Sequence, residues 1–321
     1  MESMMRSWGF ILTACLLISG CGDVKDSSST DRSSNSTADK KPVVMVTSQP
    51  LFEVADLLAG DHLEVHKITP DNIASRNWKP QKDDVKRLQN ANMILISGAG
   101  YEPWKDRVSL PGSRLKDTAT GYYSEFIRIP DAITHQHGPE GKHAHPGTVW
   151  ATWLDPELAE SQFIRVADLF VELEPAASRE ITAALTMIKT QLEKTQALAA
   201  EISAKTPALK ITLVGDSPYY HYLTSKLGLE FQYVHWDESQ ELTSIAKDEL
   251  AALTDKLPKD KPRFILLNSL QPVSTATFAT EAGFTVIRID LCEYPLQDSS
   301  NSVFERLHGN LMRLKSALQT P

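Results

Sequence analysis

Residues 175–204 read PAASREITAALTMIKTQLEKTQALAAEISA, and this stretch decides the fold. Its apolar residues recur at alternating spacings of three and four, with the spacing passing through Thr195, and so share one helical face: Ile181, Leu185, Ile188, Leu192, Ala199 and Ile202. Pro175 suits a first helical turn, and Pro207 prevents continuation. At ~1.5 Å per residue the helix would be about 45 Å long, the length of a small domain. We therefore expect a rigid helix joining two lobes; a long helix within one ordinary α/β domain is the alternative.

The sequences on either side of this helix repeat one plan of alternating strands and helices. Before it, strands are expected at 43–47, 63–68 and 93–97, and helices at 51–59, 82–91 and 156–173. After it, strands are expected at 210–215, 229–234, 264–268 and 284–290, and helices at 219–227, 242–257, 273–282 and 301–318. The fold class predicted from this alternation is α/β, with two doubly wound lobes of parallel sheet joined by one long backbone helix.

The same plan sets the expected domain boundaries: a signal peptide at 1–21, a flexible tether at 22–41, an N-terminal lobe at 42–174, the linking helix at 175–204 and a C-terminal lobe at 205–321. The N-terminal lobe includes an irregular, His-containing stretch at 109–147. Open α/β sheets bind ligands at the carboxyl ends of their strands. Site residues are therefore expected in the segments that follow strands, at 69–80, 98–104, 215–221 and 290–295.

The N-terminus has the pattern of a targeting segment. Arg6 supplies a positive charge, and the apolar run 10–18 is too short to span a bilayer. The run ends in LISGC at 17–21, which resembles a bacterial lipobox and implies lipidation of Cys21. A plain secretory signal with a chance cysteine is the alternative. The expected location is the cell envelope, lipid-anchored and facing the periplasm or the cell exterior.

Composition narrows the partners and the redox chemistry. The 321 residues carry a net charge of −8 with no block of Lys or Arg, which argues against a nucleic-acid partner. Of the three cysteines, Cys15 lies in the signal and Cys21 is the expected anchor, so Cys292 remains alone. A lone thiol makes no intramolecular disulfide, and we expect a small buried apolar side chain.

Several motifs in order carry a resemblance to a known family. WKP at 78–80, GYEPW at 100–104 and WLDP at 153–156 follow one another along the chain, after Thr47 and Pro50 at the end of the first strand. From about residue 42 to 318 the chain thus resembles the zinc- and manganese-binding lipoproteins of ABC importers, whose two lobes are joined by one long helix. The resemblance implies a monomeric solute-binding lipoprotein, not an enzyme. It would deliver a divalent metal ion, with zinc as the leading candidate, to a membrane permease and its ATPase.

The resemblance also implies four metal ligands, three His and one Asp. The matching positions hold Arg76, Ala151, Asp216 and Asp290, so only the Asp is kept. Further residues expected to line the site, besides Arg76, are Trp78, Glu102 and Trp153.

Two interpretations of the site remain open beside an ion-free one. In the first, the always-charged guanidinium of Arg76 replaces the ion by pairing with Asp216 and Asp290, so that the cleft is locked or takes another solute. In the second, a metal binds through shifted ligands, since each His-x-His places two imidazoles on one face of an extended segment. That set comprises His135, His137, His143 and His145, completed by Asp290 or Glu293. A solvated His loop without an ion is the plain alternative.

Two other function classes compete. The sequence contains no nucleophile elbow, P-loop or HExxH motif, so only the carboxylates Asp216 and Asp290 suggest an enzyme. A surface adhesin or scaffold lipoprotein that keeps the fold but not transport is the other class. A neighbouring ATPase and permease gene would favour transport.

Overall fold

The computed structural model describes residues 40–129, 133–135, 143–145, 147–236, 244–296 and 302–319. The predicted signal peptide, its Cys21 anchor and the tether up to residue 39 lie outside the described residues. Lys41–Pro321 form one compact unit. The lobe boundaries at 174 and 205 therefore stay a prediction.

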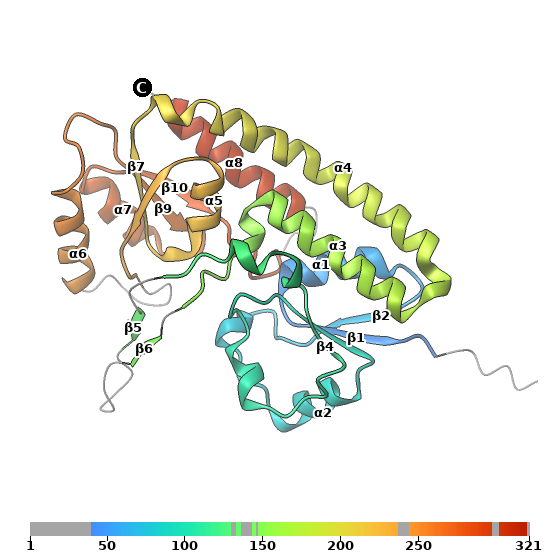
Figure 1. The fold of residues 1–321 in the computed structure, drawn as a ribbon. Coiled ribbons are helices and arrows are strands. Elements are labelled where there is room, and N and C mark those ends of the chain that lie inside the picture. Colours follow the sequence, from blue (N-terminus) through green and yellow to red (C-terminus); the bar gives the residue numbers. More distant parts are fainter. Residues whose placement is uncertain are drawn as a thin grey trace, which may run out of the picture. The chain divides into compact units, whose positions relative to one another are not determined.

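A four-stranded parallel sheet forms the N-terminal part of this unit (Figure 1). Its order is β2-β1-β3-β4, with β1 at Val43–Val46, β2 at Glu64–Lys67, β3 at Met93–Ile96 and β4 at Leu115–Asp117. The central strands β1 and β3 are apolar throughout and almost wholly buried, as parallel strands covered on both faces must be. Helices α1 (Gln49–Ala59) and α2 (Lys82–Asn90) connect the first three strands.

The edge strand β4 was not expected, because residues 109–147 read as irregular. Its three residues, LKD, include one apolar side chain and are half-buried, so they show no alternation that a sequence pattern could reveal. Pairing with β3, in the register Ile94↔Leu115, is what holds this segment extended.

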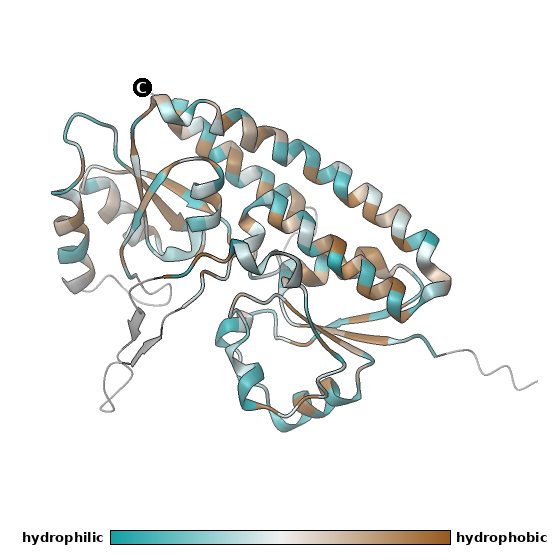
Figure 2. Cartoon of the chain, viewed as in Figure 1, coloured by the Kyte–Doolittle hydropathy of each residue, from teal (hydrophilic) through white to brown (hydrophobic). Residues whose placement is uncertain are grey.

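A second four-stranded parallel sheet follows the long helix α4 (Ser178–Ser203), in the order β10-β9-β7-β8. It comprises β7 (Thr212–Gly215), β8 (Glu230–Tyr233), β9 (Phe264–Asn268) and β10 (Thr285–Ile289), with helices α5 (His221–Lys226), α6 (Ser244–Thr254), α7 (Val273–Glu281) and α8 (Val303–Gln319). The expected α/β class with two parallel sheets is confirmed. Figure 2 shows the central strands β1 and β9 largely in the hydrophobic colour, whereas the edge strand β2, EVHK, is mostly hydrophilic.

The long helix is confirmed as α4, Ser178–Ser203, preceded by a 3-10 turn at Pro175–Ala177. The expected face is buried apart from the half-buried Leu185, and Leu198 adds to it. This face packs against α3 (Pro156–Leu173), α8 and α1, beside which α4 runs in Figure 1. One hydrophobic core joins residues before α4 in the sequence, such as Leu51 and Phe163, to residues after it, such as Leu213 and Leu311. The helix is thus a wall of a shared core. None of the described helices is both long and apolar enough to cross a bilayer.

The turn after β3 brings its end against the end of β4. Gly98, Ala99 and Gly100 all have positive φ, at 79°, 51° and 81°. A Cβ on Gly98 would lie 2.3 Å from Asp117 Oδ1, whereas one on Gly100 would meet nothing within 4 Å. The two glycines therefore share a backbone conformation and differ in the space around them.

Replacing each glycine by alanine separates these two effects. Gly100→Ala should lower the free energy of unfolding by about 1–2 kcal/mol, the cost of a left-handed conformation for an L-residue. Gly98→Ala should lower it by a further ~1–3 kcal/mol, because Asp117 or the turn must move to admit the methyl group. Urea unfolding of the two variants measures the difference. Equal losses would contradict the close approach of β3 and β4.

Candidate functional site

Side chains from the carboxyl ends of both sheets meet at one carboxylate, that of Glu293 just after β10. Arg76, in a 3-10 turn after β2, donates from Nε to Glu293 Oε1 at 2.8 Å and from Nη2 to Oε2 at 3.3 Å. The Tyr101 hydroxyl, after β3, donates to the same Oε1 at 3.0 Å. A two-pronged contact of this kind is the strong form of a charge-assisted hydrogen bond.

Two neighbouring aromatic rings lie on one side of the guanidinium. Arg76 Cζ lies 5.4 Å from the ring centroid of Trp150 and 5.3 Å from that of Tyr219, and these two rings are 4.3 Å apart. The Tyr101 ring packs 4.8 Å from Trp150. Aromatic faces attract a cation at this range, with Trp the strongest. We call Arg76, Tyr101, Trp150, Tyr219 and Glu293 the Arg76 cluster.

Burial decides the electrostatics of this cluster. The Glu293 side chain is 1% exposed and that of Arg76 is 16% exposed. Burial, and next the negative charge of Glu293, raise the pKa of Tyr101 well above its usual value, so its hydroxyl stays a donor. A carboxylate taken out of water is costly without a positive partner, so the Arg76–Glu293 pair holds these segments together.

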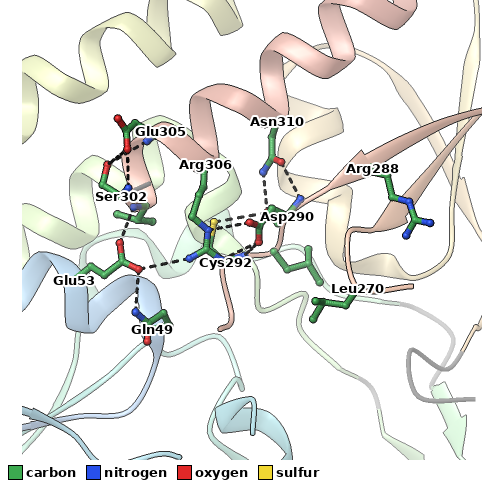
Figure 3. A network of polar contacts seen from close by, with 12 residues as sticks. Gln49, Glu53, Leu270, Arg288, Asp290, Cys292, Ser302, Glu305, Arg306 and Asn310 are labelled. Carbon is green, nitrogen blue, oxygen red and sulfur yellow. Dashed lines mark hydrogen bonds and ion pairs between the residues drawn. The ribbon is translucent and has the colours of Figure 1, made fainter. Parts of the chain in front are cut away.

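Asp290, three residues earlier, has its own arginine (Figure 3). Arg306 on α8 donates from Nε to Asp290 Oδ2 and from Nη2 to Oδ1, both at 2.9 Å, and is 4% exposed. The backbone N–H of Cys292 donates to Oδ1 at 2.7 Å. Asn310, one helical turn further along α8, receives a hydrogen bond from Asp290 N at 2.9 Å and donates one to its carbonyl at 2.8 Å.

The same arginine reaches α1. Arg306 Nη1 lies 3.5 Å from Glu53 Oε1, and Glu53 Oε2 accepts the backbone N–H of Val303 at 2.6 Å. Gln49 donates to the first of these oxygens at 3.0 Å, as Figure 3 shows. Arg306 therefore stands between a carboxylate at the end of β10 and one on α1.

These contacts correct part of the sequence interpretation. The expectation that Arg76 would neutralise Asp290 is wrong, because Arg306 on α8 holds both oxygens of that carboxylate. Asp216 is 1% exposed, and its carboxylate accepts the Tyr220 hydroxyl and the Asn268 N–H, each at 2.8 Å. Assignment of Asp216 and Asp290 to a metal stays a prediction, as does the pairing of Arg76 with Asp216.

Trp78, Glu102 and Trp153, which were expected to line the site, are all buried. Trp78 is buried and packs edge-on against Trp104, with centroids 5.0 Å apart. Trp153 donates from Nε1 to the Leu291 carbonyl at 2.9 Å. Glu102 is 1% exposed and accepts three hydrogen bonds, one from the Thr47 hydroxyl after β1 and two from backbone N–H groups of the turn after β3. Their place in a ligand site stays a prediction.

The histidines lie in a short hairpin of β5 (Ile133–His135) and β6 (His143–His145), while His137 lies outside the described residues. Antiparallel pairing sets His135 directly opposite His143, and His145 is two residues further on, so all three backbone positions belong to one face of the ladder. Among the side chains that the structure describes, no group of three or more His, Cys, Asp or Glu could hold a metal.

Sequence reasoning found some members of the Arg76 cluster and missed others. Tyr101, Tyr219 and Glu293 fall in segments expected to follow strands, and Glu293 was named as a possible ligand. Nothing singled out Trp150, which precedes a recognised motif without belonging to it. Arg306 was also missed. The sequence pattern of its helix predicts an apolar buried face, and it does not show that Arg306 is buried on that face as well.

Glu102 gives the site a testable pH dependence. Its carboxylate accepts Thr47 Oγ1 at 2.7 Å, Ser97 N at 2.8 Å and Gly98 N at 3.2 Å, and burial raises its pKa to about 7. Because the pKa of Glu102 is higher in the folded than in the unfolded state, its contribution to stability is fully present below the unfolded pKa. That contribution is lost as the pH rises through the folded pKa of about 7.

Between pH 5 and 8 the unaltered protein should therefore lose roughly 2–3 kcal/mol of unfolding free energy through this group, at about 1.4 kcal/mol per pKa unit. Glu102→Gln should flatten that dependence, while losing about 1–3 kcal/mol at low pH because its amide group repels the Gly98 N–H. Glu180→Gln, the same change on the exposed side of α4, serves as control. Equal pH slopes for all three proteins would contradict this role.

Removing the Arg306 guanidinium should be costly. Arg306→Gln leaves Asp290 without its partner and should lower the unfolding free energy by about 3–5 kcal/mol. Lys315→Gln on the same helix removes a surface ion pair with Glu201 and should cost no more than about 1 kcal/mol. Adding Asp290→Asn to Arg306→Gln should recover part of the loss in chemical denaturation. Strict additivity of the two changes would count against their pairing.

Comparisons with known proteins place this geometry in a wider context. Residues 44–317 match the family model described as zinc-uptake complex component A, periplasmic. The chain is 25% identical over 184 residues to the high-affinity zinc uptake system protein ZnuA of Bacillus subtilis, a match that spans 54% of each protein. It is 22% identical over 248 residues, 74% of each protein, to the manganese ABC transporter substrate-binding lipoprotein PsaA of Streptococcus pneumoniae.

Solved structures share the fold. The SBP FpvC from Pseudomonas aeruginosa in complex with Mn2+ superposes with a TM-score of 0.69 at 20% identity, covering 87% of this chain and 99% of that one. Zn(II)-bound AdcA from Streptococcus pneumoniae superposes with a TM-score of 0.69 at 16% identity, covering 88% of this chain and 58% of that one. At these identities the likeness shows the fold alone.

Proposed function

Because the chain belongs to the family of the periplasmic component A of zinc-uptake complexes, we propose that it is the extracytoplasmic solute-binding lipoprotein of an ABC importer for a divalent metal ion. The family match over residues 44–317 is the observation that carries this function. Two parallel sheets whose carboxyl ends meet at one buried charged cluster are in keeping with a crevice binder. The protein would act as a monomer, not as an enzyme, and pass its cargo to a permease driven by an ATPase.

Anchoring and location follow from the N-terminus. Lipidation of Cys21 would hold the protein on the membrane, with residues 22–41 as the tether. The binding unit would then face the periplasm or the cell exterior.

In this proposal the metal would bind at the His hairpin. Glu293 and Asp290, the carboxylates after β10, are each bound by an arginine. The hairpin instead sets His135, His143 and His145 on one face of a two-stranded ladder. Imidazole nitrogens suit zinc, and a site with few protein ligands leaves positions open through which an ion can be handed on.

Zinc titration of the mature protein by calorimetry tests this function. The unaltered chain should bind zinc, and a variant with His135, His137, His143 and His145 changed to Ala should lose most of that binding while keeping its metal-free Tm. His62→Ala, outside the hairpin, is the matched control. Absence of zinc or manganese binding in the unaltered chain would contradict metal carriage. Binding retained by the four-His variant would move the site away from the hairpin.

One observation favours a second candidate. The Arg76 guanidinium occupies both oxygens of Glu293. The protein would then have lost the metal site of the family and would act on another solute or as an adhesin or scaffold lipoprotein. An absence of neighbouring ATPase and permease genes, together with no metal in protein purified without chelator, would support it.

A further inference from the structure

We propose that the crevice contains a cation site that the protein fills with its own side chain. Glu293, Tyr101, Trp150 and Tyr219 make the site, and the guanidinium of Arg76 is its resident cation. Arg76 is thereby the specificity-determining residue that keeps metal ions out of the crevice. This proposal rests on the proposed function in one respect: the metal ion that Arg76 excludes from the site is the proposed cargo.

The walls of the site have the chemistry of a cation receptor. The Glu293 carboxylate is 1% exposed, so its negative charge requires a partner at short range. Two ring faces, those of Trp150 and Tyr219, lie within 5.4 Å of the guanidinium carbon. A carboxylate that accepts two N–H groups and aromatic rings close to the cation suit an organic cation such as guanidinium.

Arg76 comes from a segment that is distant in the sequence and held by backbone hydrogen bonds. Arg76 and Glu293 are 217 residues apart in the sequence. The turn that carries Arg76 is fixed by hydrogen bonds from Asn77 N to Ala74 O at 2.9 Å and from Trp78 N to Ser75 O at 3.2 Å. Buried Trp78 follows it directly, so the guanidinium is presented from a rigid support.

A divalent ion is at a disadvantage in this site. It would have to displace a charge-assisted, two-pronged contact from Glu293, and it would meet the positive charge of Arg76 nearby. The Tyr101 hydroxyl donates to Glu293, and its raised pKa keeps it protonated, so it is a poor metal ligand. Arg306 neutralises Asp290 in the same way, which leaves both carboxylates of the 290–293 segment with an internal arginine.

Cutting Arg76 back to alanine should expose the site to external cations. Arg76→Ala in the mature chain removes the occupant and leaves a space shaped for a guanidinium, so methylguanidinium at millimolar concentration should bind there. Methylguanidinium should raise the Tm of this variant in a saturable way. It should also return the tryptophan fluorescence towards that of the unaltered protein, because Trp150 lines the space. At ten times its Kd the ligand should favour the folded state about elevenfold. The unaltered protein should show neither change, and sodium chloride at equal ionic strength should have no effect.

Two further variants keep the test decisive. Arg76→Ala/Glu293→Gln should lose the rescue, because the carboxylate that binds the cation has been neutralised. If Arg76→Ala folds poorly, Arg76→Met fills the apolar part of the space, so methylguanidinium should fail to bind it while ammonium stabilises it. Absence of rescue in Arg76→Ala and of stabilisation in Arg76→Met, or equal rescue with and without the Glu293 carboxylate, would overturn the proposal. Because these probes contain no metal, a failure of zinc binding in the unaltered chain leaves the result unaffected.

Discussion

A carboxylate that water cannot reach needs a cation beside it, and in this protein the buried Glu293 imposes that requirement on the segments that meet around it. The cation is Arg76, the added donor is Tyr101, and both follow strands of the N-terminal sheet while Glu293 follows a strand of the other. Segments that follow parallel strands lie at the carboxyl ends of their own sheet. The contacts of Arg76 and Tyr101 with Glu293 join the carboxyl ends of the two sheets. The shared core along α4 then fixes the elements that carry them.

The short segment from Asp290 to Glu293 gathers most of the contacts that join distant parts of the chain. Asp290 meets Arg306 on α8, the Leu291 carbonyl accepts Trp153, and Glu293 meets Arg76. Between them Cys292 is fully buried and has a φ of 60°, a conformation that costs an L-residue on the order of 1 kcal/mol. The hydrogen bond from the Cys292 N–H to the Asp290 carboxylate holds this conformation. Burial raises the pKa of this thiol, which agrees with the small apolar side chain expected from the sequence.

Local patterns predicted the elements well and the long-range pairings poorly. Helix 156–173 and strand 264–268 match α3 and β9 residue for residue, because their periodicity, capping and flanking prolines are local signals. Strand β4 was missed because its three residues depend on β3. The predicted partner of Asp290 was wrong. Periodicity shows which face of α8 is buried, but it does not show that Arg306 on this helix binds the Asp290 carboxylate. Arg76 was singled out by its place in a motif, yet its contact with Glu293 required the fold.

The family of this chain carries out transport. The Arg76 cluster distinguishes this chain from a protein that binds a metal ion in the same place, because a guanidinium occupies Glu293. Crystals of the mature protein grown with zinc, with anomalous differences collected at the zinc edge, test this claim most directly. The account predicts the Arg76 guanidinium against Glu293, ordered in the map, with no anomalous peak in the crevice. A zinc peak at Glu293 or Asp216, with the arginine turned away, would contradict it.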